Sequence, residues 1–383
     1  MSNRAEIALV SYSTRPRGGV VHTLSLAEAL LRQGFPIHVI ALGDPATGFF
    51  RPVDVPHTIV PAPPRKDTLT ERVFAAIDTL EDWLAGPGRR FGLVHTQDCI
   101  AASAAVRVRD SGVPLKVLRT VHHVDDFTTE ALIDCQRRAI LEPDGLVVVS
   151  EHWRSLLHDE YGVEATVISN GVDPARFAAI SAEERQATRD TVGAGHRFVL
   201  LSVGGVEPRK GSIHLFDAMA SLKDDAMLVV IGGETFQDYE DYRQAAYNAL
   251  PRLGLELGRD VVVLGTVGDE DVRRWYRSAD ALAFPSTKEG FGLAVLEAAS
   301  ADLPVVASDL PVFREYLTHD KTALLAPVGD SGALAVQLRR IIDDAALRDR
   351  LRTNGRRLAD RFTWDTAATR HRELYAGVRA ATA

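Results

Sequence analysis

Short apolar runs alternate along this chain with longer segments whose apolar residues recur at helical spacing, and the alternation occurs twice. The runs are almost continuously apolar, as expected for parallel strands that helices cover on both faces. The sequence therefore predicts an α/β protein with two Rossmann-like, doubly wound parallel-sheet domains. The predicted strands are residues 7–10, 37–42, 93–96, 115–120, 146–149 and 165–168 in the first half, and 198–203, 227–231, 261–264, 281–284 and 305–307 in the second.

The alternation pauses between residues 170 and 197, where Gly, Ala, Asp and Arg are frequent and no strand pattern occurs. We therefore expect one domain over residues 1–175, a second over 190–360 and a C-terminal helix within 361–383. Doubly wound sheets bind ligands outside the carboxyl ends of their strands. With two such domains, the expected site is a cleft in which they face each other.

The charge and cysteine content exclude several classes of protein. The 44 Lys and Arg against 52 Asp and Glu leave a net charge of −8, which disfavours a nucleic-acid partner. The two cysteines have no metal-binding spacing, which fits a reducing compartment. No apolar run approaches the roughly 18 residues of a membrane span, and no secretory signal is evident. We expect a cytoplasmic protein without a transmembrane segment, and peripheral membrane contact stays open.

The most informative segment is Phe-Pro-Ser-Thr-Lys-Glu-Gly-Phe-Gly-Leu-Ala-Val-Leu-Glu-Ala at 284–298. A helix is predicted to begin near Phe291 or Gly292, so the amides of 291–293 would bind a diphosphate. Glu289 precedes this anion-binding end, and Glu297 is placed about two turns along the helix. Carboxylates would repel an anionic ligand unless they accept hydrogen bonds from its hydroxyls, as with a sugar nucleotide. The alternative is a Glu289 that the helix dipole favours and a solvated Glu297.

Two further turns carry groups suited to phosphate. Gly18-Gly19 follows the first strand and precedes a helix, although it matches neither GxGxxG nor a P-loop. Arg209-Lys210 follows the strand at 198–203 in a Gly/Pro-rich loop that begins at Gly204. Adjacent cations at such a place offset charge on a leaving phosphate, although taken alone they are more often surface charges.

Together these motifs resemble the retaining, nucleotide-sugar-dependent glycosyltransferases of family 4 (glycosyl transferases group 1), which have the two-Rossmann GT-B architecture. The resemblance covers almost the whole chain, and its most specific element is the acid–seven–acid motif Glu289…Glu297. Weaker motifs follow in the family order: Gly18-Gly19, Thr120-Val121-His122, Asn170-Gly171-Val172-Asp173, Lys210-Gly211, Pro304-Val305-Val306-Ala307 and the closing Phe362-Thr363-Trp364.

The resemblance implies a hexosyltransferase-type enzyme that moves a sugar from a nucleoside-diphosphate sugar to the hydroxyl of an unidentified acceptor, with retention and without a metal or other cofactor. The first domain would lie on the acceptor side, the second would bind the donor, and the C-terminal helix would cross back onto the first. The implied catalytic residues are His122 near the reaction centre, Arg209 and Lys210 on the diphosphate, and Glu289 on the sugar. The implied donor-binding residues are Gly18, Gly19, Asn170, Gly204, Phe291, Gly292, Leu293 and Glu297, the last on the ribose.

Two positions depart from the family pattern. Members often have arginine right after the glycine of the strand-end loop, where this chain has Gly205. Arg209 is the candidate to supply that charge. The glycine that is common before Leu-Pro-Val is Asp302 here, which we interpret as a local change of turn.

Other functions remain open from the residues alone. The alternatives are a sugar-nucleotide epimerase, a glycoside hydrolase with an acid pair at Glu289 and Glu297, and a non-catalytic nucleotide-sugar-binding subunit. Asp269-Glu270-Asp271 has the form of a DxD metal motif, but it opens a predicted helix, where acids favour the dipole. His122 and His123 are expected to point to opposite faces of a strand, and His95 to be a hydrogen-bonded polar residue rather than a ligand.

Overall fold

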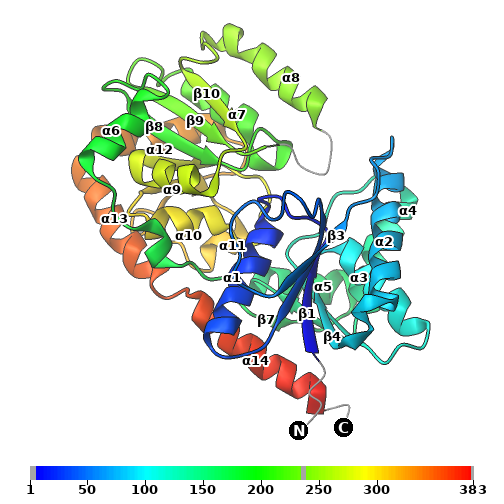
Figure 1. The fold of residues 1–383 in the computed structure, drawn as a ribbon. Helices are drawn as coiled ribbons and strands as arrows, with labels where there is room; N and C mark the ends of the chain where they lie inside the picture. The colour runs from blue at the N-terminus through cyan, green and yellow to red at the C-terminus, as the bar shows by residue number, and fades with distance from the viewer. Residues whose placement is uncertain (1–5, 234–238, 381–383) are drawn as a thin grey trace. The chain divides into compact units, whose positions relative to one another are not determined.

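The computed structural model describes residues 6–233 and 239–380 (Figure 1), and the chain divides into two compact units. The first unit comprises Met1–Gly171 and Trp364–Ala383, and the second comprises Val172–Thr363. Residues 172–189, which the sequence analysis placed at or between the domain boundaries, thus lie in the second unit. The two places where the chain changes unit are paired: the Val172 amide donates to the Phe362 carbonyl at 2.9 Å, and Val172 forms a parallel bridge with Thr363.

The first unit contains a seven-stranded parallel sheet in the order β3-β2-β1-β4-β5-β6-β7. This is a doubly wound order, in which the direction of winding reverses between β1 and β4. Every strand predicted in this half is present, and β3 was missed because it is a half-exposed edge strand without a continuous apolar run. The strands are β1 (Glu6–Ser11), β2 (His38–Gly43), β3 (His57–Pro61), β4 (Phe91–Thr96), β5 (Lys116–Val121), β6 (Gly145–Val148) and β7 (Thr166–Val167).

Helices cover this first sheet. Helix α1 packs on β1 and β2, α3 packs on β1, β4 and β5, and α2 packs on α3. The C-terminal helix α14 runs beside α1 (Figure 1), where Gln33 donates to the Asp365 carbonyl at 2.8 Å. The helices are α1 (Gly18–Arg32), α2 (Leu69–Ala85), η1 (Pro87–Arg90), α3 (Cys99–Asp110), α4 (Glu130–Leu141), α5 (Glu151–Tyr161) and α14 (Trp364–Ala380).

The second unit repeats the same winding in a six-stranded parallel sheet, in the order β10-β9-β8-β11-β12-β13. Winding reverses between β8 and β11, so each unit is a doubly wound α/β domain and the predicted fold class is confirmed. The three-residue edge strand β13 is too short to produce an apolar run and was not predicted. The strands are β8 (Phe198–Val203), β9 (Ala226–Ile231), β10 (Val261–Gly265), β11 (Ala281–Phe284), β12 (Val305–Ser308) and β13 (Leu324–Ala326).

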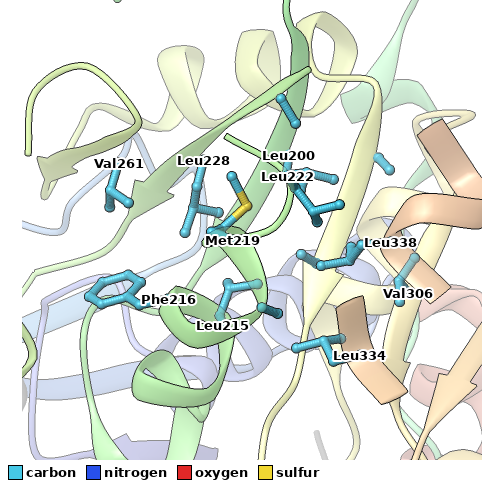
Figure 2. Packing of buried hydrophobic residues seen from close by; sticks show 14 of the residues in the cluster. Leu200, Leu215, Phe216, Met219, Leu222, Leu228, Val261, Val306, Leu334 and Leu338 are labelled. Atoms are coloured by element: carbon cyan, nitrogen blue, oxygen red, sulfur yellow. The ribbon is translucent and has the colours of Figure 1, made fainter. Parts of the chain in front are cut away.

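An apolar cluster joins the second sheet to α7 and α12 (Figure 2). Leu215, Phe216 and Met219 of α7 lie in one buried cluster with Leu334 and Leu338 of α12 and with side chains of the strands. Each such side chain stabilises the fold by about 1.5–3 kcal/mol. The helices are η2 (Pro174–Phe177), α6 (Ala182–Asp190), η3 (Pro208–Lys210), α7 (Ser212–Met219), α8 (Glu240–Ala249), η4 (Leu250–Leu253), α9 (Asp269–Ser278), α10 (Leu293–Ser300), α11 (Pro311–Arg314), α12 (Ser331–Asp343) and α13 (Ala345–Ala359).

Asp302, which replaces the family's glycine, explains why glycine is common there. Its backbone is left-handed, with φ of 56°, a conformation that aspartate tolerates better than most side chains. The carboxylate also accepts a hydrogen bond from Arg277 at 2.8 Å. The turn thus has a backbone that glycine adopts without strain, and the Asp302 side chain adds an ion pair with Arg277 of α9.

Candidate active site

The candidate donor residues of the second unit lie where its winding reverses. The loops after β8 and β11 leave neighbouring strands at the same edge of the sheet, which is the usual ligand position in this type of fold. The two loops are tied together, because the Thr287 amide donates to the Arg209 carbonyl at 2.8 Å. This bond brings the Arg209-Lys210 pair beside Glu289.

Lys210, Arg209 and Glu289 form a partly buried charge cluster. Lys210 Nζ lies 2.6 Å from Glu289 Oε1, and Arg209 Nη1 lies 3.3 Å from the same oxygen. Burial alone would raise the pKa of Glu289, but Lys210 and then Arg209 outweigh it and lower the pKa to about 2. Glu289 is therefore ionised at neutral pH. Two cations therefore share this one carboxylate.

The Gly204-Gly205 turn shapes the space around Lys210. The lysine stem lies against Gly204, where a Cβ would be 2.4 Å from Lys210 Cε. Gly205 has φ of 78°, and a Cβ there would lie 3.0 Å from the Gly233 carbonyl oxygen. An arginine at position 205 does not fit this backbone without a rearrangement. The position therefore suits glycine in this chain, and Arg209 is the second cation that this structure places on Glu289.

Helix α10 begins at Leu293, one or two residues later than the sequence analysis expected. Gly292 precedes it with φ of 90°, and a Cβ there would lie 2.4 Å from Phe313 Cε1, so only glycine fits. The first intrahelical bond runs from Val295 to the Gly292 carbonyl at 2.9 Å. The amides of Leu293 and Ala294 therefore stand at the open end of the helix, where an anion is favoured.

Glu297 lies one turn into α10, not two as predicted from an earlier helix start. It is not a solvated surface residue, because its side chain is only 14% exposed. Tyr276 donates to its Oε2 at 2.8 Å, and Arg176 Nη1 lies 3.4 Å from its Oε1. Arg176 and Tyr276 were not predicted, because nothing in their local sequence links η2 and α9 to α10.

The Asp269-Glu270-Asp271 triplet opens α9, as the helix-dipole interpretation predicted. Asp269 pairs with Arg176, whereas Glu270 and Asp271 pair with Arg273 and Arg274 on the next turn. Within residues 6–233 and 239–380, no group of three or more His, Cys, Asp and Glu is arranged to hold a metal ion.

The first unit gathers a second set of predicted residues. His122 follows β5 rather than lying on it, so the strand argument for His122 and His123 does not apply. Its Nε2 is 3.2 Å from Gln97 Oε1, and its ring packs edge-on to His22 at 4.7 Å. Burial, above all, lowers the pKa of His122 to about 3. His122 is therefore a neutral hydrogen-bonding group at neutral pH.

Gly18 and Gly19 are the first two residues of α1, not a loop before it. A Cβ at Gly19 would lie 3.7 Å from His122, so this helix start and the histidine are neighbours. One turn later, His22 Nδ1 lies 2.8 Å from Oδ1 of buried Asn170. The fold thus brings Gly19, His122 and Asn170 together around His22, which sequence analysis missed although it lies one helical turn from Gly18.

A buried histidine group anchors α14 in the first unit. His95 is bonded on both nitrogens at 2.8 Å, by Tyr375 of α14 and by Thr120 of β5, which confirms its prediction as a hydrogen-bonded polar residue. His371 of α14 is fully buried beside His95, with ring centroids 5.5 Å apart. Burial lowers the pKa of His371 to about 4 from its usual 6.5.

We predict that this histidine group makes the first unit acid-sensitive. A buried histidine with a lowered pKa stabilises the fold fully above pH 6.5, and this stability is lost as the pH falls towards 4. His371 contributes about 1.4 kcal/mol per pH unit in that window, or roughly 2 kcal/mol between pH 6.5 and 5. In denaturant titrations at both values, His371→Gln should lose less stability on acidification than the wild type. Exposed His158→Gln is the control, and an equal loss in all three proteins would contradict the prediction.

The chain has two doubly wound units, each built on a parallel sheet. Charged and glycine-rich loops follow the carboxyl ends of the strands. These features are typical of the GT-B class of glycosyltransferase. The family model described as "Glycosyltransferase Family 4" matches residues 16–176, and that described as "Glycosyl transferases group 1" matches residues 184–358. Together the two models match most of the chain. The chain belongs to this glycosyltransferase family.

Known proteins that are similar to most of this chain support the assignment. A D-inositol 3-phosphate glycosyltransferase of Jonesia denitrificans is 29% identical over 78% of this chain and 69% of its own length. A phosphatidyl-myo-inositol mannosyltransferase of Mycobacterium leprae is 28% identical over 95% of this chain and 94% of its own. The structure of Anabaena Alr3699/HepE in complex with UDP and glucose matches with a TM-score of 0.81 and 20% identity, covering 98% of this chain and 100% of that one.

Proposed function

We propose that this glycosyltransferase moves a hexosyl group from a nucleoside-diphosphate sugar to an acceptor hydroxyl, with retention of anomeric configuration and without a metal ion. The observation that carries the proposal is the second unit's cluster of Lys210, Arg209 and Glu289, tied by the Thr287–Arg209 bond to the loop that leads into α10. Cations and helix amides bind a diphosphate, and the carboxylates accept hydrogen bonds from sugar hydroxyls. The UDP and glucose bound by the Anabaena protein support this ligand class.

Each residue then has a separate task. Lys210, Arg209 and the Leu293 amide hold the diphosphate, and Gly204 leaves space for the Lys210 stem. Glu289 and the backbone of 291–292 bind the sugar, while Glu297 accepts the ribose hydroxyls. In the first unit we assign hydrogen bonding near the reaction centre to neutral His122. Gly18, Gly19 and Asn170 are assigned to donor binding.

The proposed reaction depends on stabilising the diphosphate as it leaves. It does not require a side chain of the protein to act as a base on the acceptor. The bond between the anomeric carbon and the diphosphate oxygen breaks, and its electron pair leaves on that oxygen. Lys210 and Arg209 stabilise the developing negative charge, the task that a divalent cation performs elsewhere. The acceptor oxygen bonds to the anomeric carbon on the same face, and the acceptor's proton passes to the departing phosphate oxygen. Attack on the face of departure gives retention.

The acceptor is proposed from the relatives' names alone. Two of them are named for inositol 3-phosphate and phosphatidyl-myo-inositol, so these two compounds are the first acceptors to test. A nucleotide-sugar donor and only two cysteines fit a cytoplasmic location. No helix within residues 6–233 and 239–380 is long and apolar enough to cross a membrane. For a lipid acceptor we propose peripheral contact with the membrane surface.

To test this proposal, the protein is incubated with UDP- and GDP-sugars, with and without each acceptor. Each reaction is run in the presence and in the absence of EDTA. We expect acceptor-dependent glycoside formation that EDTA does not reduce, and NMR should show the donor's anomeric configuration in the product. Donor isomerisation without acceptor would indicate an epimerase, hydrolysis of a glycoside without nucleotide would indicate a hydrolase, and binding without turnover would indicate a non-catalytic subunit. Each of these three results contradicts the proposal.

A further inference from the structure

Glu297 has both carboxylate oxygens engaged by residues that are distant in sequence. Tyr276 of α9 donates to Oε2 at 2.8 Å, and Arg176 of η2 lies 3.4 Å from Oε1. All three side chains belong to the second unit. A carboxylate held at both oxygens keeps one orientation, and each oxygen still has a lone pair that can accept a further hydrogen bond.

Arg176 and Tyr276 are themselves held in place. The second Nη of Arg176 pairs with Asp269 at the start of α9. The guanidinium lies over the Phe177 ring at 5.4 Å, and that ring packs edge-on against Tyr276 with centroids 5.4 Å apart. Phe177 and Tyr276 are buried, so neither the guanidinium nor the phenol can turn without disturbing the other.

The charges in this network favour one fixed orientation of the Glu297 carboxylate. Burial and then Glu297 raise the pKa of Tyr276 well above its usual value, so its hydroxyl remains a hydrogen-bond donor. Burial opposes the charge of Arg176, but Glu297 and Asp269 outweigh burial and raise its pKa. A fixed carboxylate with spare lone pairs is suited to a vicinal diol rather than to a phosphate.

We propose that Arg176 and Tyr276 are positioning residues that orient the Glu297 carboxylate toward the donor's ribose and so make the enzyme prefer ribonucleotides to 2′-deoxyribonucleotides. The proposal rests on the proposed function, which places Glu297 on the ribose. It adds that discrimination at the 2′-hydroxyl depends on η2 and α9, two elements that need not touch the nucleotide. A residue that only supported the fold would weaken binding of both nucleotides equally.

The test measures calorimetric dissociation constants of the full chain for UDP and 2′-deoxy-UDP, and for GDP and 2′-deoxy-GDP. For the base that binds, the wild type should prefer the ribonucleotide by about tenfold, the effect of one good hydrogen bond to a charged group. Tyr276→Phe and Arg176→Lys should reduce this preference at least threefold, because they weaken ribonucleotide binding more than 2′-deoxynucleotide binding, which keeps only the 3′-hydroxyl contact. Arg277→Ala, which removes an ion pair from the same helix α9 without touching Glu297, should keep the full preference.

The outcomes separate this inference from the proposed function. If Glu297→Gln abolishes the preference but Tyr276→Phe and Arg176→Lys both keep it, the positioning role is wrong and the function stands. If the wild type binds none of the four nucleotides, the proposed function is wrong and this inference falls with it. Equal weakening of ribo- and deoxynucleotide binding in both variants would show a structural role and would also overturn the inference.

Discussion

Lys210→Ala is expected to lower kcat for sugar transfer by about 10²–10³-fold, the cost of losing one preorganised group that stabilises a developing anion. KM for the donor should change much less, because Arg209 and the α10 amides still hold the diphosphate in the ground state. Steady-state kinetics with the donor and acceptor established for the wild type measure both constants.

The controls for Lys210 use other cations of the second unit. Half-buried Lys223, whose Nζ donates to the Gly254 carbonyl at 3.1 Å, should give wild-type kinetics as Lys223→Ala. Arg209→Ala should lower kcat less than Lys210→Ala does, because Arg209 lies farther from Glu289 and is more exposed. A kcat for Lys210→Ala within threefold of the wild type would remove this lysine from the mechanism.

Glu289→Ala is expected to destabilise the second unit by about 3–5 kcal/mol, as is usual when one partner of a buried ion pair is removed. Lys210 and Arg209 then lie beside each other without the carboxylate that both contact. Hydrogen exchange should localise the loss to β11, α10 and the loop after β8. Denaturant titration should show a lower midpoint.

The same variant tests whether the cluster is an anion site. Inorganic pyrophosphate supplies the missing negative charge, so it should raise the denaturation midpoint of Glu289→Ala more than that of the wild type. The double variant Lys210→Ala, Glu289→Ala is the matched control and should respond least. An equal shift in all three proteins would mean that pyrophosphate binds elsewhere.

The fold was largely predictable because both sheets are parallel and buried. Their central strands produce continuous apolar runs, which a single sequence displays without help from tertiary structure. The strands that were missed, β3 and β13, are edges, where one is half exposed and the other has three residues. How apolar an edge strand must be depends on which neighbouring segments cover it, and the local sequence does not contain that information.

The candidate-site residues that could be predicted are those that lie in the sequence right beside a strand end or a helix start. Gly292, Glu289 and Lys210 lie beside a strand end or a helix start, and the sequence marks these positions with glycine and proline. Residues whose role comes only from packing were missed. Arg176 reaches Glu297 across 121 positions of sequence, and Tyr276 reaches it from another helix. The left-handed backbone at Gly205 and its closeness to the Gly233 carbonyl, which leave no unstrained place for an arginine, are likewise not visible in the local sequence.

A crystal structure of the full chain with UDP or GDP tests the central assignment most directly. We predict β-phosphate oxygens within hydrogen-bonding distance of Lys210 Nζ and the Leu293 amide, and ribose hydroxyls on the Glu297 carboxylate. A nucleotide bound away from the loops after β8 and β11, with Lys210 still paired only to Glu289, would contradict it.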